Sequence, residues 1–411
     1  MGSGAYGPSG VQGQSPWPSS MILPLSILTL NAGSSNLKFA LLAPHANVRG
    51  VIDELDTTPH LLARDAGGAV LAERCWPPGD PHPFTDVIGA LLDFADAHAS
   101  GGLAAVGHRV VQGGADHIEP ELVTPALLEA LEALTPLDPL HMPYALAAMR
   151  HVTAARPALA QVACFDTAFH HTMPPVATRF ALPRAVTVQG VRPYGFHGLS
   201  YEYIAGRLAE QSPALAAGRT IAAHLGSGAS LCALLNGRSI ATTTGFSALE
   251  GLVMATRCGR LDPGVILYLG SRGHSFADIE DMLYRRSGLL GVSGISGDVR
   301  VLLASNDPHA REALELFSYR IAIETAALVG ALGGLDGLVF TAGIGEHAPA
   351  IRAAVCDRLA WLGLRLDDTA NLAGAACIST RDSRVEVRVI PTDEEAMIAR
   401  HTHATIQRAT T

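Results

Sequence analysis

The segment ILTLNAGSSNLK, from Ile27 to Lys38, runs from an apolar stretch through a Gly/Ser turn into a second apolar stretch. A related segment, IAAHLGSGAS from Ile221 to Ser230, occurs about 190 residues later. Each copy has the pattern of a strand, a polar turn and a second strand, which is typical of a β-hairpin. Unless the similarity arose by chance, the two hairpins predict a duplicated domain, with one turn from each half facing a shared cleft.

Lys38 ends the first of these turns and is the only lysine among the 29 Lys and Arg residues of the chain. A compact ammonium group makes a point contact where a planar guanidinium with five donors does not fit. We therefore predict that Lys38 is held beside an anionic group at this turn. A lysine that starts a strand by coincidence is the alternative.

The composition indicates a globular protein of about two domains. The chain has 411 residues, of which 48% are hydrophobic and 16% are charged. Its net charge of −9 argues against nucleic acid or a membrane surface as a partner, since both attract a basic face. Any bound anion must therefore be held by local groups.

The cysteines and the N-terminus point to a cytoplasmic protein. The six cysteines show no CxxC spacing and are expected to be small buried hydrophobes in a reducing compartment. Residues 1–20 are rich in Gly, Ser and Pro and lack the basic and apolar regions of a signal peptide, which predicts a disordered leader. The apolar stretch at 321–339 contains acidic residues and is expected to be a core helix and strand.

Strand-like and helix-like segments alternate along the chain, which predicts an α/β protein with mixed sheets. Helices are expected at 84–98, at 124–134 with Thr124 as N-cap, and at 307–332; strands are expected at 103–111, 161–165, 337–341 and 385–390. We place the domain boundary near residue 170. An N-terminal domain then spans 21–170 and a C-terminal, nucleotide-binding domain spans 171–395, with a last helix at 396–411 packing back on the first.

Three turns have the composition to bind phosphate: residues 31–38, 224–230 and 340–346. Each directly follows an apolar strand, and the third is expected to lead into a helix from about Glu346. Glycines allow backbone amides to approach an anion closely, and a helix N-terminus adds a favourable potential. One such turn is weak evidence, whereas three together favour a phosphate cleft.

Two arginines lie in otherwise uncharged segments, Arg109 in GHRVVQGG and Arg257 in MATRCG. A buried guanidinium needs an anionic partner, and phosphate or carboxylate suits its two-pronged geometry. Asp166 ends a strand and Glu394 starts the last helix, positions that suit a Mg²⁺ ion that keeps several waters. Internal salt bridges and a favourable helix-dipole position for Glu394 are the alternatives.

The histidines in turns could be structural or catalytic. His197 and His141 lie in turns flanked by Gly or Pro, where a lone histidine is more often a hydrogen-bonded structural residue. The pairs at 170–171 and 401–403 lack the complementary spacing of a zinc site, and we assign them to structure.

Together these segments resemble the acetate kinase family, within the superfamily of acetate and sugar kinases, Hsp70 and actin. The similarity extends from about residue 26 to residue 400. It is carried by the motifs NAGSS (31–35), GHRVV (107–111), FDTAFH (165–170), YGFHG (194–198), LEGL (249–252), TRCG (256–259), FTAGIGE (340–346) and IPT (390–392). The resemblance implies two duplicated actin-like (ribonuclease H-like) domains around a nucleotide cleft, usually in a homodimer. It also implies Mg²⁺-dependent phosphoryl exchange between ATP and a short-chain carboxylate, with Mn²⁺ as a possible substitute.

The resemblance assigns the catalytic roles as follows. The arginines for substrate and transition state fall on Arg109 and Arg257, the essential aspartate on Asp166 and the transition-state histidine on His197. The metal site falls on Asn31 and Glu394.

It also assigns the binding contacts. The two further active-site histidines fall on His141 and His224. The pocket for the acid, besides the two arginines, would be lined by Val111, Leu140 and Phe196. The nucleotide contacts would be Lys38, His224, Leu225, Gly226, Ser227, Gly228, Asp298, Val299, Arg300, Gly343, Ile344, Gly345 and Glu346.

The chain departs from the usual family pattern at several positions. Asn36 and Ser227 lie in the phosphate loops, and Gln112, Tyr201, Asp393 and, in the acid pocket, Ala248 also differ. We expect the reaction class to be unchanged, while the preferred acid and the finer phosphate contacts stay open.

A carboxylate substrate needs no general base, because its pKa of about 4–5 leaves it ionised at neutral pH. The task is instead to bring two anions together and to stabilise the charge on the transferred phosphoryl group. We expect acetate kinase activity, with ATP and acetate giving ADP and acetyl phosphate. The alternatives are a propionate kinase, a sugar or polyol kinase with Asp166 as base, and an ATP-driven chaperone or cytoskeletal relative.

Overall fold

The computed structural model describes residues 25–33, 36–44, 46–55, 57–77, 83–99 and 101–410. The expected leader at 1–20 and two serines of the first turn, Ser34 and Ser35, lie outside the described residues.

The first half of the chain forms a mixed sheet with the strand order β5-β4-β3-β2-β1-β6-β8-β7. Its strands are β1 (Ile27–Ala32), β2 (Asn36–Ala43), β3 (Ala46–Asp53), β4 (His60–Asp65), β5 (Val70–Cys75), β6 (Ala105–Val110), β7 (Glu121–Leu122) and β8 (Ala160–Phe165). The second half forms a sheet with the order β11-β10-β9-β12-β13. Its strands are β9 (Arg219–Leu225), β10 (Ala229–Leu235), β11 (Arg238–Thr242), β12 (Gly337–Thr341) and β13 (Glu386–Val389).

The two sheets share one topology. β1 is antiparallel to β2 and parallel to β6, which is parallel to β8. In the same way β9 is antiparallel to β10 and parallel to β12, which is parallel to β13. The order β3-β2-β1-β6-β8 therefore repeats as β11-β10-β9-β12-β13. The duplicated α/β fold predicted from the two hairpins is confirmed.

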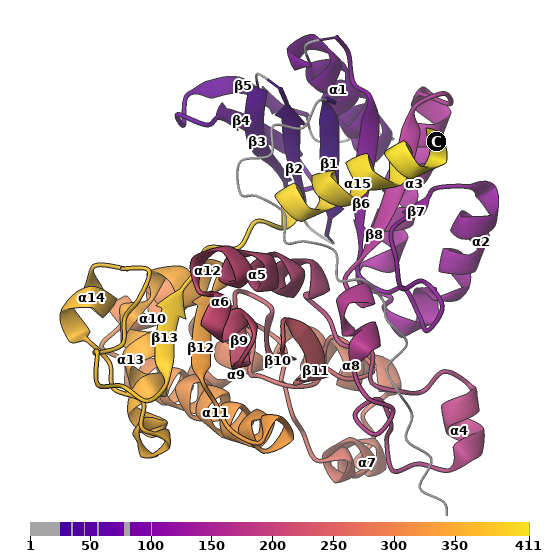
Figure 1. Ribbon diagram of the computed structural model, residues 1–411. Helices are drawn as coiled ribbons and strands as arrows, with labels where there is room; N and C mark the ends of the chain where they lie inside the picture. The colour runs from indigo at the N-terminus through magenta and orange to yellow at the C-terminus, as the bar shows by residue number, and fades with distance from the viewer. Residues whose placement is uncertain are drawn as a thin grey trace, which may run out of the picture.

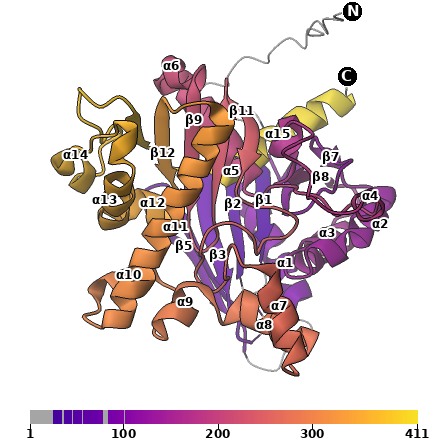
Figure 2. The same cartoon turned by 90° about the horizontal axis from the view of Figure 1, so that it is seen from below.

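Helices cover both sheets (Figures 1 and 2). The α-helices are α1 (Pro83–His98), α2 (Pro125–Ala133), α3 (Met142–Ala155), α4 (Arg184–Val188), α5 (Gly198–Gln211), α6 (Pro213–Ala216), α7 (Pro263–Ser271), α8 (Phe276–Arg285), α9 (Gly288–Ser293), α10 (Val299–Ala304), α11 (Pro308–Leu332), α12 (Ala342–His347), α13 (Pro349–Arg358), α14 (Asp368–Leu372) and α15 (Glu394–Thr410). Short 3₁₀ turns lie at Thr135–Leu137, Ala168–Thr172 and Ala360–Leu362. In Figure 2, the long helix α11 crosses the second sheet, where it contacts β9, β10 and β11.

Local signals placed most of the expected elements within a few residues. Thr124 caps α2 by accepting a hydrogen bond from the Leu127 amide at 3.1 Å, as the sequence predicted. Asp307 caps α11 by accepting from the His309 amide at 2.8 Å. The expected helix start at Glu346 is wrong, since α12 begins at Ala342. Thr341, at the end of β12, is already the N-cap, so the glycines of the third turn lie inside the first helical turns.

The last helix, α15, returns from the second sheet to the first. It lies against β1, β6 and β8, and Figure 1 shows it as the yellow helix crossing the indigo and purple strands. Gly107 in β6 permits this approach, because a Cβ there would lie 2.3 Å from Thr402 Oγ1 and 2.6 Å from Ile398 Cγ2. The return of α15 carries its first residue, Glu394, to the edge between the two halves.

Candidate active site

A cavity of about 540 Å³ lies between the turn-bearing ends of the two sheets. It is lined by most of the residues that the sequence singled out: Asn31, Lys38, Arg109, Val111, His141, Asp166, Phe196, His197, His224, Gly226, Ser227, Gly228, Arg257, Gly343, Glu346 and Glu394. Segments far apart in the sequence therefore meet at one place, as the two paired hairpins predicted.

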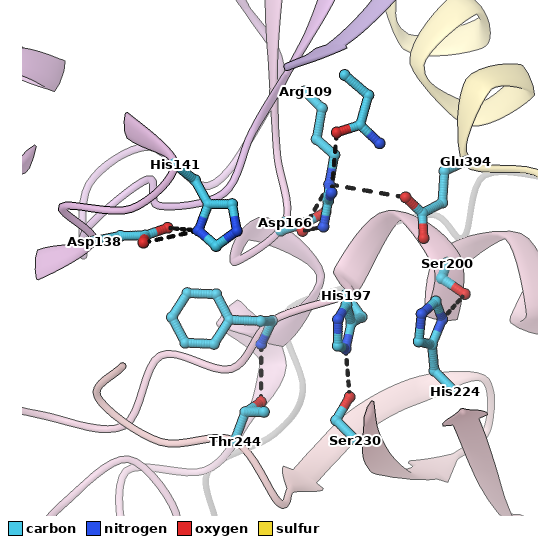
Figure 3. Close-up of polar contacts among 12 residues, drawn as sticks. Arg109, Asp138, His141, Asp166, His197, Ser200, His224, Ser230, Thr244 and Glu394 are labelled. Atoms are coloured by element: carbon cyan, nitrogen blue, oxygen red, sulfur yellow. Dashed lines mark hydrogen bonds and ion pairs between the residues drawn. The ribbon is translucent and has the colours of Figure 1, made fainter. Parts of the chain in front are cut away.

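Arg109 is held by an ion pair inside this cavity. β6 and β8 run parallel with Val110 opposite Phe165, so Arg109 and Asp166 emerge at neighbouring strand ends. Arg109 donates from Nε and Nη2 to Asp166 Oδ2, at 3.0 and 2.5 Å, and from Nη1 to Asn31 Oδ1 at 3.1 Å. Burial alone would lower the pKa of Arg109, but Asp166 and Glu394 raise it above its ordinary value. The guanidinium is therefore held in its charged form and in one orientation, and Figure 3 shows its contacts with Asp166 and Glu394.

Arg257 has a different environment. It lies in the loop between β11 and α7 and donates from Nη1 to the Ala248 carbonyl at 3.2 Å, with the Met254 sulfur at 3.8 Å. Within the described part of the chain, no carboxylate lies at ion-pair distance from it. Burial lowers the pKa of its guanidinium, partly offset by Asp138 at longer range. Arg257 is thus a half-buried cation with a vacant side for an anion.

Two carboxylates face the cavity near Arg109. Asp166 is fully buried, and its Oδ1 has no hydrogen-bond partner among the described residues. Glu394 Oε2 lies 3.8 Å from Arg109 Nε. Burial raises the pKa of Glu394, although Arg109 acts in the opposite direction. Its neighbours Asp393 and Glu395 both bind Arg49 of β3, at 2.6 and 3.4 Å, so Glu394 alone of the three acids turns toward Arg109.

These donors fit a hard divalent cation that keeps water ligands. The free, buried Oδ1 of Asp166 and the carboxylate of Glu394 are oxygen donors of the kind that Mg²⁺ accepts through its waters. The described residues contain no cluster of three or more His, Cys, Asp or Glu side chains that could hold an ion alone. Asn31 is a less suitable metal ligand, because its Oδ1 already accepts a hydrogen bond from Arg109.

His197 and His224 form a stacked pair on the wall opposite Arg109. Their ring centroids are 4.2 Å apart and their planes differ by 14°. Each Nδ1 is bonded to a serine hydroxyl, Ser230 for His197 at 2.7 Å and Ser200 for His224 at 2.8 Å. Burial and the nearby cations lower the pKa of His224 to about 3 and that of His197 well below its usual range. Both imidazoles are therefore neutral at physiological pH.

The backbone at His197 is held in an unusual conformation. Its φ of 60° lies in the left-handed region, and the residue caps α5. The next residue, Gly198, donates its amide to the Asp166 carbonyl at 2.9 Å, and a Cβ on Gly198 would lie 2.0 Å from that carbonyl oxygen. The motif YGFHG thus allows α5 to start against Asp166.

His141 also faces the cavity, and the structure supplies a partner that the sequence did not suggest. Its Nδ1 lies 2.9 and 3.1 Å from the two oxygens of the buried Asp138, as seen in Figure 3. The neighbouring wall is apolar, with Val111, Phe196 and Ala248 lining it. A small acid could place its alkyl group there.

Several predicted contacts lie away from the cavity wall. Asp298 and Arg300 pair with each other at 2.6 Å at the start of α10, where the Arg300 side chain is 90% exposed. Leu225, Val299 and Ile344 belong to the core of the second half or pack against it. Leu140 is half-buried and Gly345 is buried, and neither lines the cavity.

Other wall residues were missed from the sequence. Among them are Thr244, Met254, Thr392 and Glu395. Met254 and Glu395 lie within three residues of predicted site residues, so proximity was the available signal. Thr244 carries no such signal, and its role is to accept a hydrogen bond from the Phe196 amide at 3.0 Å (Figure 3).

The histidines assigned to structure have structural partners. His170 bonds Ser239 Oγ at 2.8 Å and the Phe196 carbonyl at 3.0 Å, and burial lowers its pKa to about 4. His401 of α15 bonds Glu202 of α5 at 2.8 Å, joining the two halves. None of the described helices combines the length and the apolar character required to cross a bilayer.

The sequence profile of the Acetokinase family matches residues 26–400. The chain belongs to this family. It is 54% identical over 387 residues to the acetate kinase of Rhodopseudomonas palustris (strain TIE-1), covering 91% of this chain and 97% of that protein. It is 49% identical over 384 residues to the acetate kinase of Nitrobacter hamburgensis, covering 92% and 95% of the two chains.

Solved structures of the family have the same fold. The propionate kinase of Francisella tularensis superposes with a TM-score of 0.85 at 36% identity, covering 92% of this chain and 98% of that one. The acetate kinase of Porphyromonas gingivalis gives a TM-score of 0.83 at 34% identity, covering 93% and 100%. The predicted family membership is confirmed.

Proposed function

We propose that this protein is a carboxylate kinase that transfers a phosphoryl group reversibly between ATP and acetate, giving ADP and acetyl phosphate. One observation carries the proposal. Two arginines face one cavity, Arg109 already neutralised by Asp166 and Arg257 lacking a carboxylate partner within the described residues. Such a pair can bind one small carboxylate and stabilise the charge of a transferring phosphoryl group.

The state of Asp166 favours a carboxylate over a sugar as acceptor. Its Oδ2 accepts two hydrogen bonds from Arg109, so this oxygen is already engaged. A sugar hydroxyl would need a carboxylate free to accept its proton. An ionised acid needs no base, so the arrangement suits it.

The roles of the residues in the mechanism follow from their positions. Arg257 binds the carboxylate of the acid while its alkyl group lies against Val111, Phe196 and Ala248. Arg109 donates to the equatorial oxygens of the transferring group, and His197 donates from the opposite wall. The second and third turns, at Ser227, Gly228 and Gly343, offer backbone amides to the nucleotide phosphates, with Lys38 across the cavity.

Asp166 and Glu394 would hold a Mg²⁺ ion through its waters, with Mn²⁺ as a substitute. The bound ion would supply positive charge to the nucleotide phosphates. Asn31 would then orient Arg109 more than it binds the metal, because Arg109 occupies its oxygen.

We further propose that residues 21–170 with the C-terminal helix from residue 396, and residues 171–395, act as two domains that close over the substrates and exclude water. Nucleotide contacts by Asp298, Val299 and Arg300, which lie outside the cavity, are expected to form on closure. A cytoplasmic location is supported by six free cysteines, although Cys75 and Cys377 are exposed and not buried as expected.

The protein is expected to act as a homodimer. Exposed apolar side chains gather on α7 and α8, with Leu267 74% and Phe276 88% exposed, and an ion pair between Arg260 and Glu324 joins this region to α11. A second copy covering this surface would bury it. Light scattering on the purified protein, compared with a Leu267→Glu variant, tests the assignment, and a monomeric wild type would refute it.

The activity test is direct. Purified protein is incubated with ATP and Mg²⁺ and with acetate, propionate, glycerol or no acceptor, and acyl phosphate is trapped with hydroxylamine while ADP is measured. We expect ADP and acyl phosphate to form in equal amounts with acetate. The small side chain of Ala248 in the acid pocket favours propionate as a second substrate. ADP formation with glycerol, or without any acceptor at the same rate, would overturn the proposal.

A further inference from the structure

A buried hydrogen-bond relay ends on His197. Ser230 Oγ lies 2.7 Å from His197 Nδ1 and 2.5 Å from the hydroxyl of Tyr201. Ser230 and Tyr201 are both fully buried, Ser230 on β10 and Tyr201 on α5. The other ring nitrogen, Nε2, faces the glycine turn of the cavity, because a Cβ on Gly228 would lie 3.2 Å from it.

The number of protons in the relay fixes their direction. A serine hydroxyl has a single proton, so Ser230 can donate to His197 or to Tyr201 but not to both. In the described part of the chain, the phenolic proton of Tyr201 has one acceptor, Ser230 Oγ. If Ser230 donated to Tyr201, the buried phenolic proton would lose its acceptor, which is costly. If Tyr201 and His197 Nδ1 both donated to Ser230, the buried Ser230 proton would have no acceptor, because its oxygen has no third partner in the described part of the chain. Tyr201 therefore donates to Ser230, and Ser230 donates to His197 Nδ1.

We propose that Tyr201 and Ser230 are positioning residues that hold neutral His197 as the tautomer with its proton on Nε2, aimed into the cavity. Resting on the proposed function, this relay makes His197 a neutral hydrogen-bond donor to the transferring phosphoryl group. A histidine tautomer is set by the partner of its other nitrogen, and here that partner is a hydroxyl donor.

The surroundings agree with a neutral ring. The groups that act on His197 from neighbouring elements are His224, Arg109, Arg257 and His170, and with burial they lower its pKa well below the usual range. Burial raises the pKa of Tyr201 well above its ordinary value, so the phenol keeps its proton. The relay thus starts from a permanent donor and ends on a ring that cannot take a second proton near neutral pH.

The tautomer can be measured in the free enzyme. Histidine-selective ¹⁵N labelling and ¹H–¹⁵N spectra report which nitrogen carries the proton, and the His197 signals are those lost in a His197→Gln variant. We expect the wild type to carry the proton on Nε2 throughout pH 6–8. We expect Tyr201→Phe, which keeps the ring, and Ser230→Ala to show a mixture of the two tautomers. A proton on Nδ1 in the wild type, or unchanged signals in both variants, would overturn the relay.

Kinetics give a second, independent readout. Removing one neutral hydrogen bond should lower kcat about tenfold in Ser230→Ala and about fivefold in Tyr201→Phe, with both KM values unchanged. Because both residues act through one proton on His197, the double variant should match Ser230→Ala alone. Multiplicative losses in the double variant would contradict a shared relay.

A matched control separates the relay from general loss of a buried hydroxyl. Tyr194→Phe removes a phenol that bonds the Gly190 carbonyl at 2.7 Å, away from His197, and should leave both kcat and the His197 signals unchanged. The spectra also separate this inference from the proposed function. A wild type without kinase activity but with the Nε2 proton would refute the function alone, whereas an active enzyme with an Nδ1 proton would refute the relay alone.

Discussion

The two walls of the cavity carry one arginine each, and the two arginines have opposite environments, one ion-paired and the other without a carboxylate among the described residues. Arg109, on the first sheet, is tied to Asp166 and Asn31 and lies close to Glu394. Arg257, in the second half, has a carbonyl and a thioether as neighbours. The same contrast extends to the turns, since the first turn bears Lys38 while the second bears the neutral, stacked His224.

This difference shows how a duplicated fold can build two unlike surfaces. The strand order is the same in both halves, so each presents a polar turn at the same edge. The first half has placed the ion pair of Arg109 and Asp166 at this position, fixed before substrate arrives, together with Lys38. The second half has filled it with neutral donors and one unpaired cation, which gain their partner only from an anion. A negative ligand would therefore be attracted chiefly to Arg257 on this wall and to Lys38 on the other.

The largest expected effect comes from removing either arginine. Arg257→Ala and Arg109→Ala should each lower kcat/KM about a thousandfold, the scale of a preorganised electrostatic donor. The two variants should differ in stability. Arg109→Ala leaves Asp166 buried and unpaired and should lower the free energy of unfolding by about 3 kcal/mol, whereas Arg257→Ala should lower it little. Steady-state kinetics and urea unfolding test both, with the exposed Arg272→Ala as control. Equal losses of unfolding free energy in the two variants would contradict the contrast between an ion-paired Arg109 and an unpaired Arg257.

Glu394→Gln should raise the Mg²⁺ concentration for half-maximal rate about a hundredfold, by loss of a charged oxygen donor. The matched control is Asp393→Asn, because Asp393 is the neighbouring acid and is bound by Arg49. This variant should change the Mg²⁺ requirement far less. Metal titrations at saturating ATP and acetate measure the effect. An equal shift in both variants would indicate a general effect of negative charge at the start of α15.

The buried His170, at the boundary between the halves and bonded to Ser239 of the second half, predicts a pH effect on stability. The pKa of His170 is lowered to about 4 in the folded protein, so the unfolded chain binds the extra proton between about pH 6.5 and pH 4. His170 therefore contributes to a loss of stability as pH falls, about 2 kcal/mol between pH 7 and pH 5. Urea unfolding of His170→Gln at several pH values should show a flatter profile, while the exposed His309→Gln should keep the wild-type slope.

Lys38→Arg has the smallest expected effect and tests the first turn most specifically. Lys38 pairs with Asn31 across β1 and β2 and lines the cavity. A bulkier, more directional guanidinium should raise the KM for ATP about threefold without changing the melting temperature. Wild-type kinetics would mean that the single lysine is an accident of composition, and the carboxylate kinase proposal would stand without it.

Short-range sequence signals were enough for the fold class and for the elements that were named, whereas β3 to β5 and helices such as α3, α7 and α8 were not predicted. Alternation of apolar residues located the strands, and Thr124 and Asp307 marked helix starts because capping depends only on the next few residues. The start of α12 was placed four residues late, since its glycines favoured a loop and Thr341, which precedes the helix, makes no side-chain capping bond that would mark the start. Family motifs identified most cavity residues, while Leu140, Asp298 and Arg300, which they also assigned, do not line the cavity.

The sequence by itself determined the duplicated strand–turn–strand units, the family, and the residue types gathered at the cleft. These properties depend on residues close together in the sequence, through side-chain periodicity, capping and glycine content. Only the tertiary structure decided which charges are paired. The Arg109–Asp166 ion pair depends on the register of β6 against β8, and the position of Glu394 depends on α15 packing over Gly107. The proton direction in the Tyr201–Ser230–His197 relay depends on burial and on the number of acceptors in reach, and both are set by contacts between distant segments.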